Sequence, residues 1–309
     1  MARTKSARFR ALLARPEIIV APCAYDCVSL RLLEQIGFQL AFHGGYNTAA
    51  PLLGLPDVGL ITMTETIGHA RNMAAAVEIP VVCDVDDGFG DEINVMRTTR
   101  EAIRAGLAGM YIEDQQAPKR CPALGGNKVI TTEAMIRKLK AAFKVREAED
   151  PDFVVIARTH ASRVIGMEEA IKRGIAYAKE GAEVIFVDLC YSDKAIEELK
   201  IIAEKIEPHA HLLANMTETV GRPLLTNEEL QNMGFKIAFY PITAIITAAG
   251  ALERVFKELK EKGTTKALVD GMMPFSKLGQ LLGIDAIREQ EQRFAEGGGA
   301  KGNECGCRC

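Results

Sequence analysis

The sequence predicts a closed (β/α)8 barrel of the TIM type, an α/β fold, on three observations. Short runs of β-branched residues alternate with amphipathic helical stretches along most of the 309-residue chain, which favours a parallel sheet. Eight such strand-then-helix units follow one another, the number that closes a parallel sheet into a barrel. Most of the predicted strands also end in a charged or amide side chain, as the strands of barrel enzymes do.

The eight predicted strands are short and rich in branched apolar residues. They cover residues 18–21, 40–42, 81–85, 108–112, 153–157, 184–187, 212–214 and 237–240. Each is followed by a helical pattern, at residues 27–36, 62–77, 94–105, 132–149, 167–179, 193–206, 227–233 and 243–262. Capping residues set several helix ends: Thr62 or Thr64 can begin the second helix, and Gly37 and Gly106 end the first and third.

Composition and charge exclude several classes of function. The net charge is −3 and the pI is about 6.1, so no basic excess is available to neutralise nucleic-acid phosphates. No uncharged apolar run is long enough to span a bilayer, and the basic N-terminus has no signal-peptide pattern. The eight cysteines are scattered and do not form a disulfide framework, which predicts a reducing, cytoplasmic location.

The C-terminal residues 297–309 differ from the rest of the chain. They combine glycines with Cys305, Cys307 and Cys309, which predicts a flexible tail with exposed thiols. A soft-metal or redox role for these thiols is one interpretation, and a tail without such a role is the other.

The third strand leads into three acidic residues, Asp84, Asp86 and Asp87, before a Gly-x-Gly turn. A core strand gains nothing from such a cluster, because burying an unpaired charge is costly. Carboxylates at the end of a strand can hold a hard cation, and Mg²⁺ prefers oxygen ligands. The alternative interpretation is a solvated acidic turn, the ordinary role of Asp-Gly clusters.

In a closed parallel barrel, the C-terminal ends of the strands meet at one rim. The polar residues expected there follow strands two to seven: His43, Asp84, Asp86, Glu113, Arg158, His160, Asp188 and Asn215. Their convergence favours an active site over an inert barrel.

Residues 117–128 form a loop with two prolines, two glycines and three cations but no periodicity, which is typical of a functional loop. Cys121 follows Lys119 and Arg120, and neighbouring cations lower a thiol pKa and favour the thiolate. A thiol that titrates near neutral pH can carry a proton. An ordinary surface cysteine on a basic loop is the alternative.

Six short motifs follow one another along roughly residues 10–290: 53–57 (LGLPD), 84–90 (DVDDGFG), 112–115 (IEDQ), 119–121 (KRC), 156–159 (IART) and 213–218 (LANMTE). Together they resemble the isocitrate lyase / phosphoenolpyruvate mutase superfamily, and most closely its short methylisocitrate lyase-type branch.

The resemblance implies a barrel whose C-terminal helix is swapped between subunits, and a homotetramer built as a dimer of such dimers. Residues 1–296 would then form one barrel domain, with residues 268–294 as the swapped arm.

The resemblance also implies a metal site with Mg²⁺, or Mn²⁺ as an alternative. Asp84 would bind the metal directly, and Asp86 and Glu113 would hold its water molecules. Asp57 would lie beside the metal as a catalytic residue. Cys121 would be the catalytic acid that protonates the leaving enolate after carbon–carbon cleavage.

Substrate-binding roles are likewise implied by the resemblance. Gly44 and Gly45 would offer backbone N–H groups, and Arg158 would pair with a carboxylate. The remaining predicted contacts are Asp188, Asn215 and Thr217, the last two with the distal carboxylate.

The chain departs from the lyase pattern at His43, Pro122–Ala123, His160 and Asp188. The normal residues there are Ser, Gly-His, Asp and Glu, so we expect a substrate other than methylisocitrate itself. His43 is predicted to be an additional acid–base group, because imidazole titrates near neutral pH. A neutral, hydrogen-bonded His43 is the alternative.

These features predict a Mg²⁺-dependent lyase that cleaves a 2-hydroxy di- or tricarboxylate, such as an alkylmalate, to a 2-oxo acid and a second carboxylate. One alternative is a phosphonate enzyme of the phosphoenolpyruvate mutase or phosphonopyruvate hydrolase type, or an oxaloacetate decarboxylase or hydrolase. A third hypothesis is a non-catalytic barrel with a degraded site.

Overall fold

A computed structural model describes residues 3–189, 194–218 and 224–298 of the chain. The contacts within the chain define two compact units, Met1–Ala251 and Leu252–Cys309. Cys190 and the three cysteines of the C-terminal tail lie outside the described residues, so their predicted roles stay predictions.

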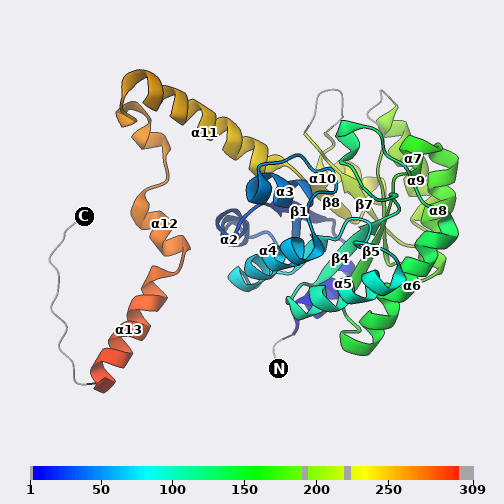
Figure 1. Ribbon diagram of the computed structural model, residues 1–309, viewed down its shortest axis with the longest axis horizontal. Helices are drawn as coiled ribbons and strands as arrows, with labels where there is room; N and C mark the ends of the chain where they lie inside the picture. Colours follow the sequence, from blue (N-terminus) through cyan, green and yellow to red (C-terminus); the bar gives the residue numbers. More distant parts are fainter. Residues whose placement is uncertain (1–2, 190–193, 219–223, 299–309) are drawn as a thin grey trace. The chain divides into compact units, whose positions relative to one another are not determined.

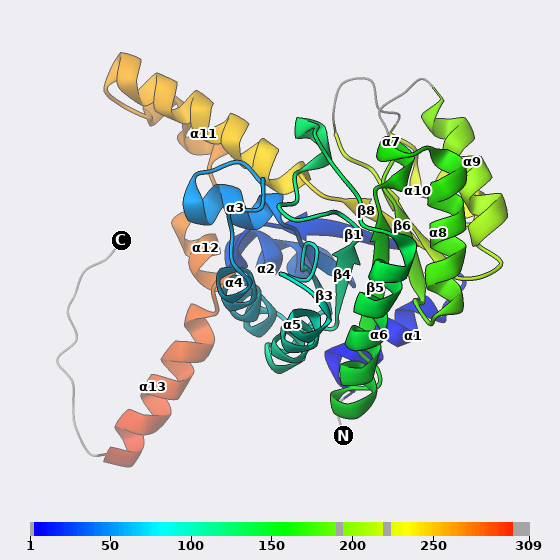
Figure 2. The ribbon, with the colours of Figure 1, turned by 45° about the vertical axis from the view of Figure 1, so that its right-hand side comes forward.

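The first unit is built on a closed barrel of eight parallel strands in the order β1 to β8 (Figures 1 and 2). The strands are β1 Ile19–Ala24, β2 Ala41–His43, β3 Val81–Asp84, β4 Gly109–Glu113, β5 Val154–Thr159, β6 Val184–Val187, β7 His211–Asn215 and β8 Ile237–Tyr240. The predicted barrel is therefore confirmed, with strand ends shifted by at most three residues.

The predicted helices also form. They are α2 Cys27–Ile36, α4 Met63–Ala76, α5 Glu92–Arg104, α6 Thr132–Glu149, α8 Met167–Lys179, α9 Ala195–Ile206, α10 Asn227–Asn232 and α11 Thr243–Lys262. Thr62 rather than Thr64 caps α4, in a capping box with Glu65. Among the described residues of the first unit, three further α-helices were not predicted: α1 Lys5–Leu13, α3 Tyr46–Leu53 and α7 Ala161–Val164.

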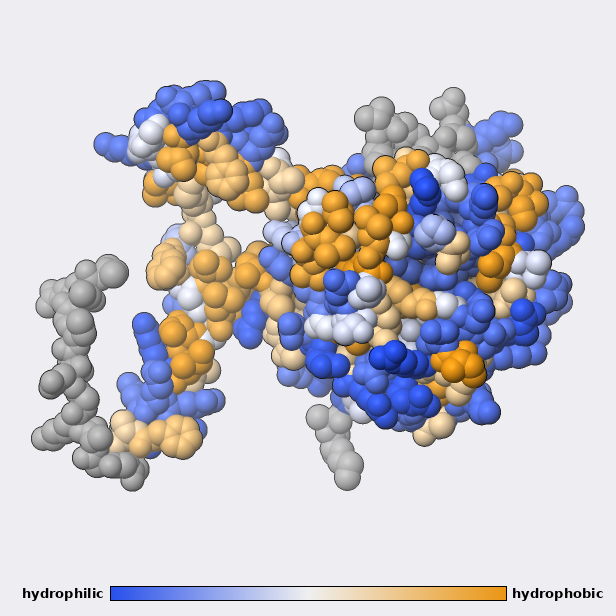
Figure 3. Space-filling view, viewed as in Figure 1, coloured by the Kyte–Doolittle hydropathy of each residue, from blue (hydrophilic) through white to orange (hydrophobic). Residues whose placement is uncertain are grey.

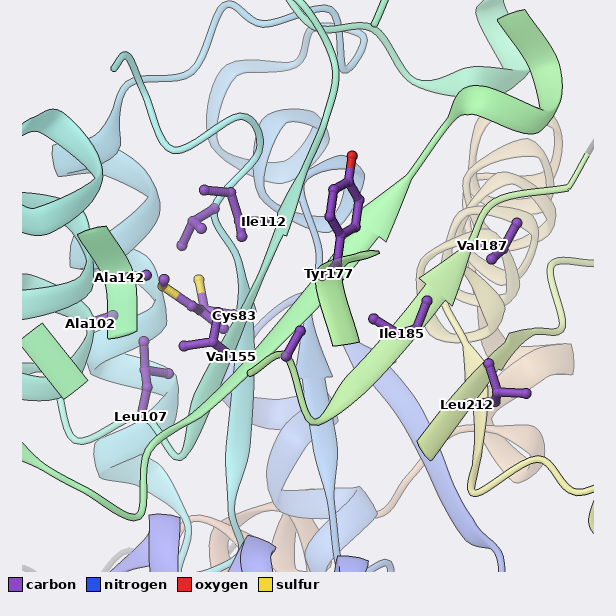
Figure 4. Close-up of a cluster of buried hydrophobic side chains, with 14 of the residues drawn as sticks. Cys83, Ala102, Leu107, Ile112, Ala142, Val155, Tyr177, Ile185, Val187 and Leu212 are labelled. Atoms are coloured by element: carbon purple, nitrogen blue, oxygen red, sulfur yellow. The ribbon is translucent and has the colours of Figure 1, made fainter. Parts of the chain in front are cut away.

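Two hydrophobic layers lie on either side of the barrel wall, because successive strand residues point to opposite faces. One cluster includes Phe42, Val82, Tyr111, Ile156, Phe186 and Phe239. Its aromatic rings lie close together, and the ring centroids of Phe42 and Phe239 are 4.7 Å apart. The alternate residues, among them Cys83, Ile112, Val155 and Ile185, belong to a second cluster with helix residues such as Ala102, Ala142 and Tyr177 (Figure 4). Because strand residues alternate between the two clusters, the cluster to which the last residues of a strand belong shows which face of the barrel wall their side chains lie on.

The second unit contains the end of α11, the 3-10 helix η2 Lys266–Gly271, α12 Phe275–Leu281 and α13 Ile284–Gly298. Several of its large apolar side chains are exposed, including Phe256, Phe275 and Phe294, and Figure 3 shows apolar side chains along this unit. Within the described parts of the chain, no helix is both long and apolar enough to cross a membrane.

Candidate active site

A cavity of about 260 Å³ lies at the C-terminal rim of the barrel and collects most of the predicted site residues. Those that line it are Gly44, Gly45, Asp57, Asp84, Cys121, Arg158, Asp188, Asn215 and Thr217. Apolar side chains complete the lining, among them Leu124, Phe239, Ile242 and Ile246. The volume is below the usual range of sites for drug-sized ligands, which indicates a small metabolite.

Three buried carboxylates share one side of this site. The Nζ atom of Lys119 lies 2.5 Å from Asp57 Oδ1 and 2.7 Å from Asp86 Oδ1. Asp84 lies beside them, and a Cβ atom added at Gly45 would meet Lys119 Nζ at 2.8 Å and Asp84 Oδ2 at 3.2 Å. Position 45 therefore needs a glycine so that the backbone can approach the cluster closely.

The turn after β3 places these carboxylates. Asp84 Oδ1 accepts the backbone N–H of Asp86 at 3.0 Å, and Asp84 Oδ2 accepts the N–H of Gly45 at 3.1 Å. Asp86 has a φ of 50°, a left-handed conformation that costs energy in a residue other than glycine. In this structure the Gly45 N–H is thus bonded to Asp84, whereas the sequence predicted that it faces the substrate.

The cluster fits a hard divalent cation. Burial raises the pKa of Asp84 and raises that of Asp86 well above its ordinary value, and Lys119 offsets this only in part. Among the described residues, no three His, Cys, Asp or Glu side chains are placed to hold a metal together. Mg²⁺ prefers oxygen ligands and keeps several of its waters. A site in which one carboxylate would bind the ion directly and the other carboxylates would bind it through water therefore suits Mg²⁺.

Arg158 connects the carboxylate cluster to the opposite side of the cavity. Its NH1 atom lies 3.3 Å from Glu113 Oε2, and its NH2 atom lies 3.3 Å from Asp188 Oδ1. The guanidinium carbon lies 4.4 Å from the centre of the Phe186 ring. Arg158 Nε is buried and has no hydrogen-bond partner among the described residues.

His160 lies between the same two carboxylates. Its Nε2 atom is 2.7 Å from Glu113 Oε2, and its Nδ1 atom is 3.5 Å from Asp188 Oδ2. Burial alone would lower the pKa of His160, but Glu113 and Asp188 together raise it above its ordinary value. Burial opposes ionisation of Glu113, yet His160 and Arg158 lower the pKa of Glu113 to about 2.

The two residues predicted to hold the distal carboxylate, Asn215 and Thr217, lie together at the end of β7. Thr217 Oγ1 donates a hydrogen bond to Asn215 Oδ1 at 2.6 Å, and Asn215 Nδ2 lies 3.5 Å from Asp188 Oδ1. The Asn215 amide is therefore fixed with its nitrogen toward Asp188.

His43 is the predicted site residue that the structure keeps away from the cavity. Its inward neighbour on β2 is Phe42, so the His43 side chain points to the outer face of the barrel. There its Nε2 atom lies 2.9 Å from Thr48 Oγ1 and 3.0 Å from His69 Nδ1. Burial and His69 lower the pKa of His43 to about 3, which corrects the predicted acid–base role in favour of a neutral, hydrogen-bonded ring.

The prediction about the thiol of Cys121 also needs correction. Burial raises its pKa, and the neighbouring Lys119 and Arg158 offset this only in part. The ammonium group of Lys119 is paired with Asp57 and Asp86, and its effect on the thiol is smaller than that of burial. Cys121 is consequently a protonated thiol at neutral pH, the form in which it can donate a proton.

Lys119 was interpreted only as a cation beside Cys121, so its ion pairs with Asp57 and Asp86 were not predicted. His160 was expected at the rim of the barrel, where the structure places it. Its place two residues after Arg158 agrees with this, because alternate residues of an extended chain face the same side.

The comparison with known proteins decides the family. A family model described as "Phosphoenolpyruvate phosphomutase" matches residues 9–260. The chain belongs to this family, within the phosphoenolpyruvate mutase/isocitrate lyase superfamily. Members of the superfamily generally depend on a divalent metal.

Similar proteins of this family include two lyases. The chain is 40% identical to 2,3-dimethylmalate lyase from Eubacterium barkeri, across 94% of this chain and 99% of the relative. It is 36% identical to a 2-methylisocitrate lyase from Halalkalibacterium halodurans, across 94% of this chain and 93% of the relative. A solved structure of phosphonopyruvate hydrolase with oxalate and Mg²⁺ is also similar, with a TM-score of 0.86, 27% identity and coverage of 94% of this chain and 99% of that chain.

Proposed function

We propose that this protein is a Mg²⁺-dependent carbon–carbon lyase that cleaves a 2-hydroxy dicarboxylate or tricarboxylate of the alkylmalate or methylisocitrate type. The observation that supports it most is the placement of a protonated thiol, Cys121, in the same cavity as the carboxylate cluster and Arg158. A thiol is not needed to bind a metal or a carboxylate here, but cleavage of this kind leaves a carbon that must accept a proton.

In the proposed site, Asp84 would bind Mg²⁺ directly, and Asp86 and Glu113 would hold water molecules around it. Mn²⁺ would fit the same oxygen donors. When bound, the ion supplies positive charge near oxygen atoms on which negative charge develops. Lys119 occupies part of this space, so we expect its ammonium group to move when the ion binds.

The proposed reaction is a retro-aldol cleavage. The 2-hydroxyl group gives its proton to a carboxylate of the cluster, for which we propose Asp57. The hydroxyl oxygen forms the C=O bond of the 2-oxo acid, and the C2–C3 bond breaks. The electron pair of that bond becomes the enolate of the second carboxylate, and the S–H group of Cys121 donates a proton to C3. Arg158 holds one carboxylate, while Asn215 and Thr217 hold the other.

The substrate is proposed to be small and to carry an alkyl group. The cavity is about 260 Å³, and Leu124, Ile242 and Ile246 form an apolar part of its lining. An alkyl group buried against these side chains would stabilise binding, because each buried CH₂ contributes about 0.8 kcal/mol.

The test is release of a 2-oxo acid from a panel of 2-hydroxy acids that includes malate, 2,3-dimethylmalate and 2-methylisocitrate. We expect an oxo acid from an alkylated member in the presence of Mg²⁺ and none with EDTA. The proposal fails if every member of the panel is inert, or if Cys121→Ser releases the oxo acid at the wild-type rate.

A second candidate is hydrolysis of a phosphonate or of oxaloacetate. The similar structure of phosphonopyruvate hydrolase favours it. Such reactions do not need the thiol, so Cys121→Ser would retain activity. Phosphorus NMR with phosphonopyruvate and carbon NMR with oxaloacetate would identify this outcome.

We further propose that the protein works as a homotetramer of helix-swapped dimers in the cytoplasm. Exposed Phe256, Phe275 and Phe294 in the second unit support this, because monomers rarely expose several large aromatic side chains. Light scattering coupled to gel filtration should give four times the chain mass of 33.6 kDa, whereas a monomer mass would contradict the proposal.

A further inference from the structure

One buried amide at the end of β4 is not explained by the proposed chemistry. The Gln115 side chain is almost completely buried, with 1% of its surface exposed. Its Nε2 atom donates to Glu113 Oε1 at 2.7 Å and to the backbone O of Arg120 at 3.0 Å. Its Oε1 atom accepts from the backbone N–H of Arg120 at 3.1 Å and from Asn127 Nδ2 at 2.8 Å.

These four contacts satisfy both donors and both acceptor lone pairs of the amide, and its Nε2 atom also lies 3.4 Å from His160 Nε2. Three of them go to the loop that follows β4, and the fourth goes to Glu113. Asn127 adds a second bond to the same turn, from its Nδ2 atom to the O atom of Arg120 at 2.8 Å.

The base of the loop is held separately by backbone bonds. Gln115 and Val129 form an antiparallel bridge, and the N–H of Gln116 donates to Lys128 O at 2.9 Å. Ile130 N likewise donates to Asp114 O at 2.9 Å. The Gln115 side chain is therefore not needed to close the loop at its base, and it acts on the middle of the loop.

The middle of the loop carries the functional groups. Arg120, which Gln115 holds at both its N–H and its C=O, lies between Lys119 and Cys121. Lys119 reaches the carboxylate cluster, and Cys121 lines the cavity. The N–H of Cys121 also donates to Asp57 O at 2.8 Å, so this part of the loop lies over the site.

We propose that Gln115 is a positioning residue that clasps residues 119–121 over the cavity and so sets the place of the Cys121 thiol. The clasp ties the loop to Glu113, a carboxylate of the proposed metal site. This inference rests on the proposed role of the loop, but its test below requires no turnover.

The experiment measures the rate at which iodoacetamide alkylates Cys121 in the metal-free full-length protein, resolved by peptide mass spectrometry. Gln115→Met keeps the side-chain length and removes all of the hydrogen bonds of the amide. The matched control is Gln116→Met, the same change at the next residue, whose side chain is exposed. Thermal unfolding confirms that each variant is folded.

We expect iodoacetamide to alkylate Cys121 about ten-fold faster or more in Gln115→Met than in the wild type. Loss of the hydrogen bonds that hold the loop raises the fraction of molecules in which the loop is open. Asn127→Ala, a milder change nearer the surface, should raise the rate about two- to five-fold through loss of its bond to Arg120. Gln116→Met should react at the wild-type rate.

The buried thiols of Cys23 and Cys83 distinguish positioning from general loosening of the fold. Their alkylation should not change in the Gln115 variant if the clasp acts on the loop alone. The proposal is overturned if Cys121 reacts at the wild-type rate in both Gln115→Met and Asn127→Ala, or if Cys23 and Cys83 become reactive in parallel. If Gln115→Met does not fold, Asn127→Ala carries the same test.

Discussion

Lys119 gives the sharpest prediction about the carboxylate cluster. Its ammonium group lies 2.5 Å from Asp57 Oδ1 and 2.7 Å from Asp86 Oδ1. Each of the three side chains has no more than 7% of its surface exposed. Lys119→Met removes the positive charge and retains most of the side-chain volume. Removing one partner from a buried ion pair costs about 3–5 kcal/mol, because the remaining charges are left uncompensated.

We expect the lower end of that range, about 3 kcal/mol at pH 7, because the loop can move and let water reach the carboxylates. A domain of this size loses roughly 2–4 °C in Tm per kcal/mol, so the variant should melt roughly 6–12 °C below the wild type. The matched control is Lys128→Met in the same loop, which should change stability by less than about 0.5 kcal/mol.

The pH dependence of this loss has a defined sign. Folding raises the pKa of Asp84 and Asp86, so the protonated form of each is favoured in the folded state. Stability from such a group is present at low pH and is lost as pH rises through the folded pKa. Without Lys119 the pKa values of Asp84 and Asp86 should rise further. The loss of stability in Lys119→Met relative to the wild type should therefore shrink as pH falls from 7 toward the pKa of an ordinary carboxyl group.

The assay is thermal unfolding in EDTA and then in excess Mg²⁺, for the wild type and both variants. Mg²⁺ should raise the Tm of Lys119→Met by more than that of the wild type, because no ammonium group competes for the carboxylates. Equal stability of the Lys119 and Lys128 variants at pH 7 would refute the reasoning.

Four further predictions concern single residues. Asp84→Asn should weaken Mg²⁺ binding by at least about ten-fold in calorimetry, and an unchanged affinity would exclude it as the direct ligand. Cys121→Ser should lower kcat by about 10²-fold or more while oxalate still binds, and full turnover would exclude the thiol as the acid. Glu113→Gln should destabilise the protein at pH 7. The difference in free energy of unfolding from the wild type should shrink as pH falls from about 4.5 toward 2, because folding lowers the pKa of Glu113 to about 2. Urea unfolding at several pH values measures this difference, and a constant difference would contradict the prediction. His43→Leu should lower the Tm but leave the pH profile of kcat unchanged, since the ring faces the outer layer of the barrel; a shifted profile would return His43 to the acid–base chemistry.

Much of the fold was predictable because the strand pattern is regular and glycines and capping residues mark the helix ends. The helix α3 was missed because it begins directly after Gly45 and contains Pro51, features that usually indicate a loop. The 3-10 helix Pro122–Leu124 within the loop after β4 has too few residues to show a period.

The strand ends also held more information than the sequence interpretation used. Phe42 lies on the inner face of β2, so His43, the next residue, had to point outward by strand alternation alone. The same alternation turns Arg158, in β5, and His160, the residue that follows β5, to the same side. The position of Lys119 could not be derived in this way, because a loop side chain has no periodicity and its contacts with Asp57 and Asp86 depend on the closed barrel.

The most direct test of the central claim is cleavage of an alkylmalate in D₂O with Mg²⁺, followed by proton NMR. The proposed reaction predicts a 2-oxo acid and a second carboxylate in equal amounts. The second carboxylate should carry one deuterium, on the carbon that was C3 of the substrate. Formation of both products should stop with EDTA and with Asp84→Asn. Absence of both products from every alkylmalate tested, together with hydrolysis of phosphonopyruvate or oxaloacetate by the same preparation, would contradict the claim.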